Sequence, residues 1–167
     1  IDTNNSLNPA ELIKKDRYQV FLLACPGSIP FHFAAHPWFV INKRGVVSRW
    51  EVLFRKERCK TSWGHLHLNF LSPFSGIEIF PFFSRYFWNG RLLGFLEGGE
   101  NSTAKHMTAF IENSKEPYPY RYHYSFTGPN SNTYARWVLS HFSEFGGRLP
   151  RNAFGKNYAL KNLIARS

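Results

Sequence analysis

Residues 18–54, YQVFLLACPGSIPFHFAAHPWFVINKRGVVSRWEVLF, contain the pattern that decides the fold. Apolar and β-branched runs occupy residues 18–25, 31–41 and 46–54. Pro26-Gly27 separates the first run from the second, and residues 42–45 separate the second from the third. Runs of this length between turn-forming residues are typical of strands. We predict three strands, the last two paired as a hairpin, with Pro37 placing part of the middle strand at an edge or bulge.

The remaining sequence adds further strands and helices. Strict alternation predicts a strand over 63–71, with His65, His67 and Asn69 on one face. Other patterns predict strands over 91–97 and 118–126, a loop over 72–90, and helices within 9–15, from Asn101 or Ser102 onward, and over 131–142. This order favours an α+β fold in which helices pack on an antiparallel sheet. We divide the chain into an N-terminal arm with a short helix (1–17), one domain (18–158) and a C-terminal tail (159–167).

The composition is that of a folded domain. The 167 residues are 43% hydrophobic and 18% aromatic, which excludes a disordered chain. The densest apolar run, residues 79–83, is far shorter than the ~18 residues that a membrane-spanning helix needs. Cys25 and Cys59 make neither a disulfide framework nor a zinc site, so we interpret both as small buried thiols.

The charge balance limits the partners. A net charge of +10 favours polyanions, of which an anionic cell-envelope polymer is one. The basic residues are scattered, with their densest cluster at 55–60, so we expect no specific nucleic-acid binding. Aromatic residues within 74–88 lie beside Arg85 and Arg91, a combination that suits peripheral membrane contact, although loop aromatics also cap cores. We expect a monomer.

The segment YSFTGPNSNTYA, residues 124–135, carries the strongest chemical signal. A turn at 128–130 delivers Ser131 to the first turn of the predicted helix. Unpaired backbone N–H groups and the helix dipole at that place stabilise a nucleophile and the oxyanion that it creates. The alternative is that Ser, Asn and Thr only cap the helix.

These motifs resemble an uncharacterised bacterial family, domain of unknown function 3750. The resemblance lies in FHFAAHPWFVI (31–41), SRWEV (48–52), FWNGRLLGFLEGGE (87–100), YPY (118–120), GPNSNTYARWVL (128–139) and LPRNAFGKNY (149–158). The family itself implies no activity. Since the sequence starts at Ile1, we expect a processed bacterial chain whose compartment stays open, with the cell envelope or periplasm as one alternative.

A more distant resemblance implies a chemistry. A His on an early strand, followed by Asn-nucleophile-Asn at the start of a late helix, is similar to the circularly permuted papain-like group, which includes NlpC-type peptidases, lecithin:retinol acyltransferase relatives and PPPDE peptidases. The similarity implies an NlpC-type fold with His36 as the base and Ser131 at the position where that group has Cys. A serine hydroxyl ionises less readily than a thiol and depends on a base that a third group orients.

Glu51, His67 and Asn69 are the candidates for this third group. We select Glu51 as a catalytic residue because it lies on the strand paired with that of His36. A structural salt bridge to a neighbouring arginine, Arg49 or Arg55, is the alternative for Glu51. For His67 the alternative is a solvated or hydrogen-bonded strand histidine.

Substrate binding is assigned to Asn130, Asn132, His67 and Trp38. The histidines lack the Cys or Asp companions of a familiar metal site, so neither a metal nor another cofactor is expected. Three functions stay open at this point. They are a hydrolase or acyltransferase acting on an amide or ester, an inactive papain-like module that binds a peptide or envelope ligand, and a basic protein that binds nucleic acid or an anionic polymer.

Overall fold

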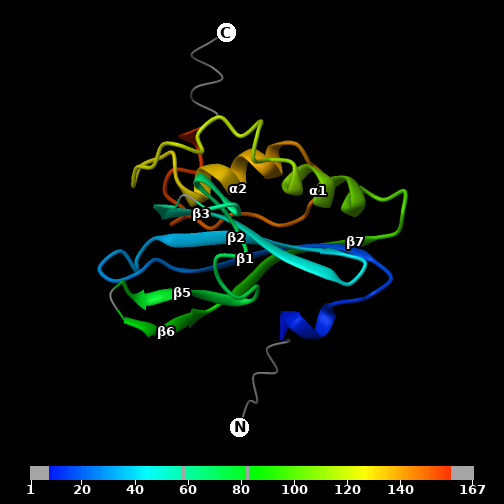
Figure 1. Cartoon of the computed structure of the whole chain (residues 1–167), viewed down its shortest axis with the longest axis horizontal. Coiled ribbons are helices and arrows are strands. Elements are labelled where there is room, and N and C mark those ends of the chain that lie inside the picture. Colours follow the sequence, from blue (N-terminus) through cyan, green and yellow to red (C-terminus); the bar gives the residue numbers. More distant parts are fainter. Residues whose placement is uncertain (1–7, 58, 82, 159–167) are drawn as a thin grey trace.

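The computed structural model describes residues 8–57, 59–81 and 83–158, which form three layers (Figure 1). The elements are η1 (Pro9–Leu12), β1 (Tyr18–Pro26), β2 (Ala35–Lys43), β3 (Val46–Glu57), β4 (Ser62–Leu68), β5 (Ser75–Phe80), β6 (Phe83–Asn89), β7 (Arg91–Gly98), α1 (Thr103–Glu112) and α2 (Ser131–Ser140). A five-stranded antiparallel sheet in the order β4-β3-β2-β1-β7 forms the middle layer. The helices cover one face, and the β5–β6 hairpin covers the other (Figure 1). The predicted α+β class is confirmed.

Strand β1 is buried on both faces because it lies inside the sheet, between the two outer layers. Val20 and Leu22 pack in the core beneath the helices, whereas Phe21 and Leu23 pack on the hairpin side. A strand covered on both faces needs apolar residues at successive positions. This explains the uninterrupted apolar run that predicted it.

Strands β2 and β3 pair over only part of their length, and this partial pairing makes room for the site. Their register runs from Phe39↔Trp50 to Lys43↔Val46. Within the described residues, the start of β2 therefore pairs only with β1, and Pro37 lies in this part, at an edge as predicted. The predicted strand over 31–41 starts too early, because residues 31–34 form a turn before Ala35.

The prediction of a loop over residues 72–90 is wrong. Strands β5 and β6 form a hairpin there, and Pro81, which suggested a loop, lies in the turn between them. Phe74, Ile77 and Trp88 pack against the sheet, whereas Phe83 is exposed, so the apolar residues do not alternate simply. This mixture concealed the strand period.

The prediction of a strand over residues 118–126 is also wrong, because the segment forms turns and irregular loop. Pro117 and Pro119 have no N–H groups to donate to a ladder. Tyr118 is instead fully buried, with its ring centroid 5.0 Å from that of Tyr134 and 5.2 Å from that of Trp137. The aromatic residues of this segment thus fill the core rather than extend the sheet.

Both long helices have the predicted starts. Ser102 caps α1 by accepting a hydrogen bond from the Lys105 N–H. Helix α2 ends at Ser140, slightly before the predicted residue 142. Val138 is fully buried, and Trp137 and Phe142 pack against the same core, as expected from their spacing.

The remaining predictions concern the ends of the chain and the cysteines. Asn8 caps η1 within the predicted arm, while residues 1–7 and the predicted tail, 159–167, lie outside the described residues. Cys25 is buried as predicted, but Cys59 is exposed because it lies in the turn that joins β3 to β4. The interpretation of Cys59 as a buried thiol is therefore wrong.

Candidate functional site

Ser131 is the first residue of α2, and Asn130 caps the helix. The Asn130 Oδ1 accepts hydrogen bonds from the N–H groups of Asn132 (3.0 Å) and Thr133 (3.3 Å), and Thr133 Oγ1 accepts one from the Asn130 N–H (3.0 Å). This reciprocal arrangement is a capping box. In the described part of the chain, neither the N–H nor the Oγ of Ser131 has a hydrogen-bond partner. The positive end of the α2 dipole therefore has an unused donor beside an unused hydroxyl.

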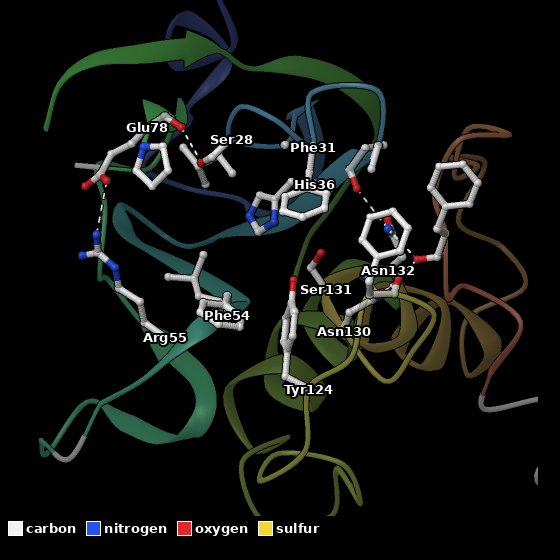
Figure 2. Close-up of a pocket in the computed structure, with 18 of the residues that line it drawn as sticks. Ser28, Phe31, His36, Phe54, Arg55, Glu78, Tyr124, Asn130, Ser131 and Asn132 are labelled. Atoms are coloured by element: carbon white, nitrogen blue, oxygen red, sulfur yellow. Dashed lines mark hydrogen bonds and ion pairs between the residues drawn. The ribbon is translucent and has the colours of Figure 1, made fainter. Parts of the chain in front are cut away.

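Asn132 joins the start of α2 to the start of β2. Its Nδ2 donates to the carbonyl of Ala35 (3.0 Å), 97 positions earlier, and to that of Phe154 (2.9 Å). Ala35 directly precedes His36, so the same bond holds His36 against the helix N-terminus. Figure 2 shows the His36 and Ser131 side chains facing one cavity, which both residues line. No hydrogen bond between these two side chains is present among the described residues.

A buried network holds the His36 ring. Its Nε2 lies 2.9 Å from Oε2 of Glu51, on the neighbouring strand β3. Arg49 donates to both oxygens of the same carboxylate, from Nε to Oε1 (2.7 Å) and from Nη2 to Oε2 (2.8 Å). The side chains of Arg49 and Glu51 have no exposed surface. The sequence offered two alternatives for Glu51, a position beside His36 or a salt bridge to an arginine. In the structure the Glu51 carboxylate makes both contacts.

The charge state of Glu51 determines which ring nitrogen of a neutral His36 carries the hydrogen. Burial raises the pKa of the Glu51 carboxyl, but the hydrogen bond from His36 and the charge of Arg49 outweigh burial and hold that pKa below its usual range. An ionised carboxylate only accepts hydrogen bonds. We therefore assign the hydrogen of a neutral His36 to Nε2, which leaves the lone pair on Nδ1.

The cavity beside these groups has a volume of about 460 Å³. It lies among the turn before β2, the end of β3, the β5–β6 hairpin and the loop before α2. Tyr124 points its hydroxyl into this space next to Ser131 and His36 (Figure 2). The Tyr124 ring packs against Phe54 and His65, with centroid distances of 5.6 and 5.4 Å, and burial raises the pKa of its phenol. Tyr124 therefore places an O–H donor near Ser131.

Asn130, like Asn132, lines the cavity, but its amide is engaged by the protein. Its Nδ2 donates to the carbonyls of Ser125, Phe126 and Phe154. This side chain therefore anchors the loops on either side of the α2 N-terminus. Asn130 lies at the cavity wall, and its role in substrate binding stays a prediction.

His67 and Trp38 lie away from the cavity wall. His67 is fully buried, and its ring nitrogens bond Ser62 Oγ (2.8 Å) and the Arg55 carbonyl (2.8 Å). Trp38 is fully buried, donates from Nε1 to the Pro73 carbonyl (2.8 Å), and has the Arg49 guanidinium 4.3 Å from its ring centroid. Trp38 therefore helps to enclose the Arg49–Glu51 pair.

Two contributors to this geometry were not singled out from the sequence. Tyr124 belongs to a run of alternating tyrosines, 118–124, in which no local signal separates a cavity residue from a core residue. For Arg49, the sequence indicates only a structural salt bridge with Glu51. Its buried, bidentate contact with Glu51 depends on the enclosure that β5 and Trp38 provide.

The described residues, 8–57, 59–81 and 83–158, bring no group of three His, Cys, Asp or Glu side chains together in a way that could hold a metal ion. Among the same residues, no helix has the length and apolar character needed to cross a bilayer.

The site combines a helix N-terminus bearing an unpaired serine with a histidine fixed by a buried carboxylate, in an α+β domain. Residues 18–158 match the model of the family described as "Protein of unknown function (DUF3750)". The chain belongs to this family. No curated protein and no solved structure matches it.

Proposed function

We propose that the protein is a hydrolase or acyltransferase that acts on an ester or amide through Ser131. The observation that carries the proposal is the convergence of the unpaired Ser131 Oγ and N–H with His36, whose Nε2 is bonded to the buried Glu51 (Figure 2). A serine nucleophile needs an oriented base of this kind. The order of His36 on an early strand and Ser131 on a late helix also supports the permuted papain-like relationship, with Ser in place of Cys.

The chemistry follows from these positions. The Ser131 Oγ attacks the substrate carbonyl carbon while His36 Nδ1 takes the hydroxyl proton. The Ser131 N–H and the Tyr124 O–H stabilise the negative charge on the carbonyl oxygen. The bond to the leaving alcohol or amine then breaks, and the leaving group takes the proton from His36. Water, or a second nucleophile in a transferase, attacks the acyl-serine and releases Ser131.

A binding module without turnover is the second candidate. It is favoured by the absence, within the described residues, of a hydrogen bond between Ser131 and His36. In enzymes without substrate this bond is often long and tightens only in the complex. The reactivity of the serine therefore separates the two candidates.

The test is covalent labelling with a fluorophosphonate probe. We expect the native protein to be labelled, Ser131→Ala to abolish labelling, and His36→Ala to slow it at least about 100-fold. Ser28→Ala is the matched control, because Ser28 lines the same cavity but donates its hydroxyl to the Glu78 carbonyl (2.6 Å). Labelling that persists in Ser131→Ala, or is absent from the native protein, contradicts a serine enzyme.

A cysteine variant distinguishes a degenerate thiol site from an unreactive helix cap. In a Cys59→Ser background, Ser131→Cys is expected to react rapidly with iodoacetamide, because the helix N-terminus stabilises a thiolate and His36 accepts its proton. Adding His36→Ala is expected to slow this reaction. If neither the native serine nor the new cysteine reacts, Ser131 is only a residue of the helix start.

A further inference from the structure

The reactive side chains that line the cavity lie together at one end, around Ser131. The Ser131 and Tyr124 hydroxyls and the His36 ring face this end (Figure 2). Among the described residues, neither hydroxyl has a hydrogen-bond partner, and the His36 ring is bonded through Nε2 alone. A carbonyl group placed there would meet a nucleophile, a base and a hydrogen-bond donor. This end therefore suits the reacting group of a substrate.

Most polar side chains elsewhere in the lining are paired within the protein; the exception is Asn132, whose Oδ1 is buried without a hydrogen-bond partner in the described part of the chain. Ser28 donates to the Glu78 carbonyl, and Arg55 Nη2 lies 3.3 Å from the Glu78 carboxylate, on the opposite side of the cavity from Ser131 (Figure 2). The amides of Asn130 and Asn132 donate to backbone carbonyls, as described above. A ligand that carried a charge into this space would gain no unpaired counter-charge from these side chains.

The space between the two ends is apolar. Its wall is formed mainly by aliphatic and aromatic side chains, among them Ile29, Leu53, Phe54, Phe70, Leu71 and Ile77. The volume of about 460 Å³ lies within the range of small-molecule sites. The walls therefore favour an apolar body attached to the reacting carbonyl.

The apolar surface continues outside the cavity. Phe31, Phe126 and Phe154 line the cavity, and each contacts Phe33 with ring centroids 5.9–6.3 Å apart. Phe126 also contacts Phe31 and Phe154, with ring centroids 5.5 and 5.7 Å apart. These four rings are 41–54% exposed. Exposed apolar patches of contacting residues usually mark binding sites. This patch gives an apolar substrate a continuous path to Ser131.

We propose that the substrate is an aliphatic acyl ester or thioester whose chain occupies this cavity. The inference rests on the proposed function and names its substrate class. The Ser131 Oγ forms a bond to the acyl carbon, the C–O or C–S bond to the carrier breaks, and the alcohol or thiol leaves with the proton held by His36. Water then restores the serine and releases the fatty acid. A soluble ester and a membrane lipid are two sources of the same acyl group.

Binding without turnover tests the inference independently of catalysis. Methyl esters of four to eight carbons are titrated into Ser131→Ala by calorimetry. We expect affinity to rise about fourfold for each added methylene, because the cavity removes that group from water. Affinity that does not depend on chain length overturns the inference, even if the native serine reacts with the fluorophosphonate probe.

A matched pair of variants locates the bound chain. Phe54 lines the cavity and is 77% exposed, whereas Phe83 is 65% exposed and lies outside the lining, so neither change removes a core residue. In the Ser131→Ala background, Phe54→Glu is expected to weaken binding of the eight-carbon ester at least tenfold, while Phe83→Glu leaves it unchanged. Equal effects of the two variants overturn the assignment of the chain to this cavity.

Turnover by the native protein separates the remaining outcomes. p-Nitrophenyl esters of increasing chain length, a peptide anilide and phospholipid vesicles are offered in parallel. Rates that rise with chain length support the inference, and cleavage of vesicle lipid without cleavage of soluble esters identifies a membrane source. Preferential cleavage of the peptide anilide overturns the inference. Chain-length-dependent binding without any turnover supports the cavity as an acyl site and contradicts the proposed function.

Discussion

Glu51→Gln tests whether the buried network carries the stability that its geometry implies. The substitution keeps the shape of the side chain but removes its charge. The Arg49 guanidinium, which has no exposed surface, then loses the counter-ion to which it donates two hydrogen bonds. Breaking a buried ion pair in this way typically costs about 3–5 kcal/mol, because the remaining charge is buried without compensation.

For a chain of 167 residues, a loss of this size lowers Tm by roughly 6–20 °C. Thermal unfolding followed by circular dichroism measures it. Glu78→Gln is the matched control: it removes the ion pair with Arg55, whose side chain is 48% exposed, and is expected to cost less than about 1 kcal/mol. If Glu51→Gln loses no more stability than this control, the Arg49–Glu51 pair is not the buried, mutually dependent pair described above.

The stabilisation that Glu51→Gln removes is expected to depend on pH. Because the pKa of Glu51 is lowered in the folded state, the unfolded chain binds more protons at pH values between the two pKa values. The stabilisation is therefore complete above the unfolded pKa of ~4.3 and is lost as the pH falls toward the folded value. The difference in unfolding free energy between the native protein and Glu51→Gln is expected to be constant near neutral pH and to shrink under acid. A difference that stays constant down to pH ~3 would contradict this assignment.

Three further outcomes are expected. Asn130→Ala removes the cap of α2 and lowers the free energy of unfolding by at least about 1–2 kcal/mol in urea titrations, and an unchanged midpoint would show that the cap is dispensable. A disulfide reagent at mildly alkaline pH should modify the exposed Cys59 quickly and Cys25 only after unfolding, since burial raises the pKa of the Cys25 thiol to about 12; equal rates would contradict the described burial. With an ester that the native protein cleaves, Tyr124→Phe should lower kcat about 100-fold with little change in KM, and an unaffected kcat would remove its O–H from the mechanism.

Local sequence patterns determined most of the sheet and both long helices. The apolar runs of β1, β2 and β3 and the capping residues before α1 and α2 are short-range signals, because strand period, turns and caps depend on neighbouring residues. The same signals identified Ser131 at a helix start. The selection of Glu51 rested on hairpin pairing, which places residues of adjacent strands side by side.

Only the tertiary structure decided what surrounds these residues. Pro117 and Pro119 prevent the tyrosine segment, 118–126, from pairing as a strand, so its side chains pack against the core instead. Tyr124, in the same segment, lies at the cavity. The β5–β6 hairpin, residues 75–89, covers the second face of the sheet, for which the sequence predicted no covering element. The same hairpin helps to bury the Arg49–Glu51 pair. Burial and pairing between distant segments depend on the shape of the whole domain, and no periodicity within one segment encodes them. The sequence by itself therefore determined which groups were available, whereas the packing of three layers decided which of them face a common cavity.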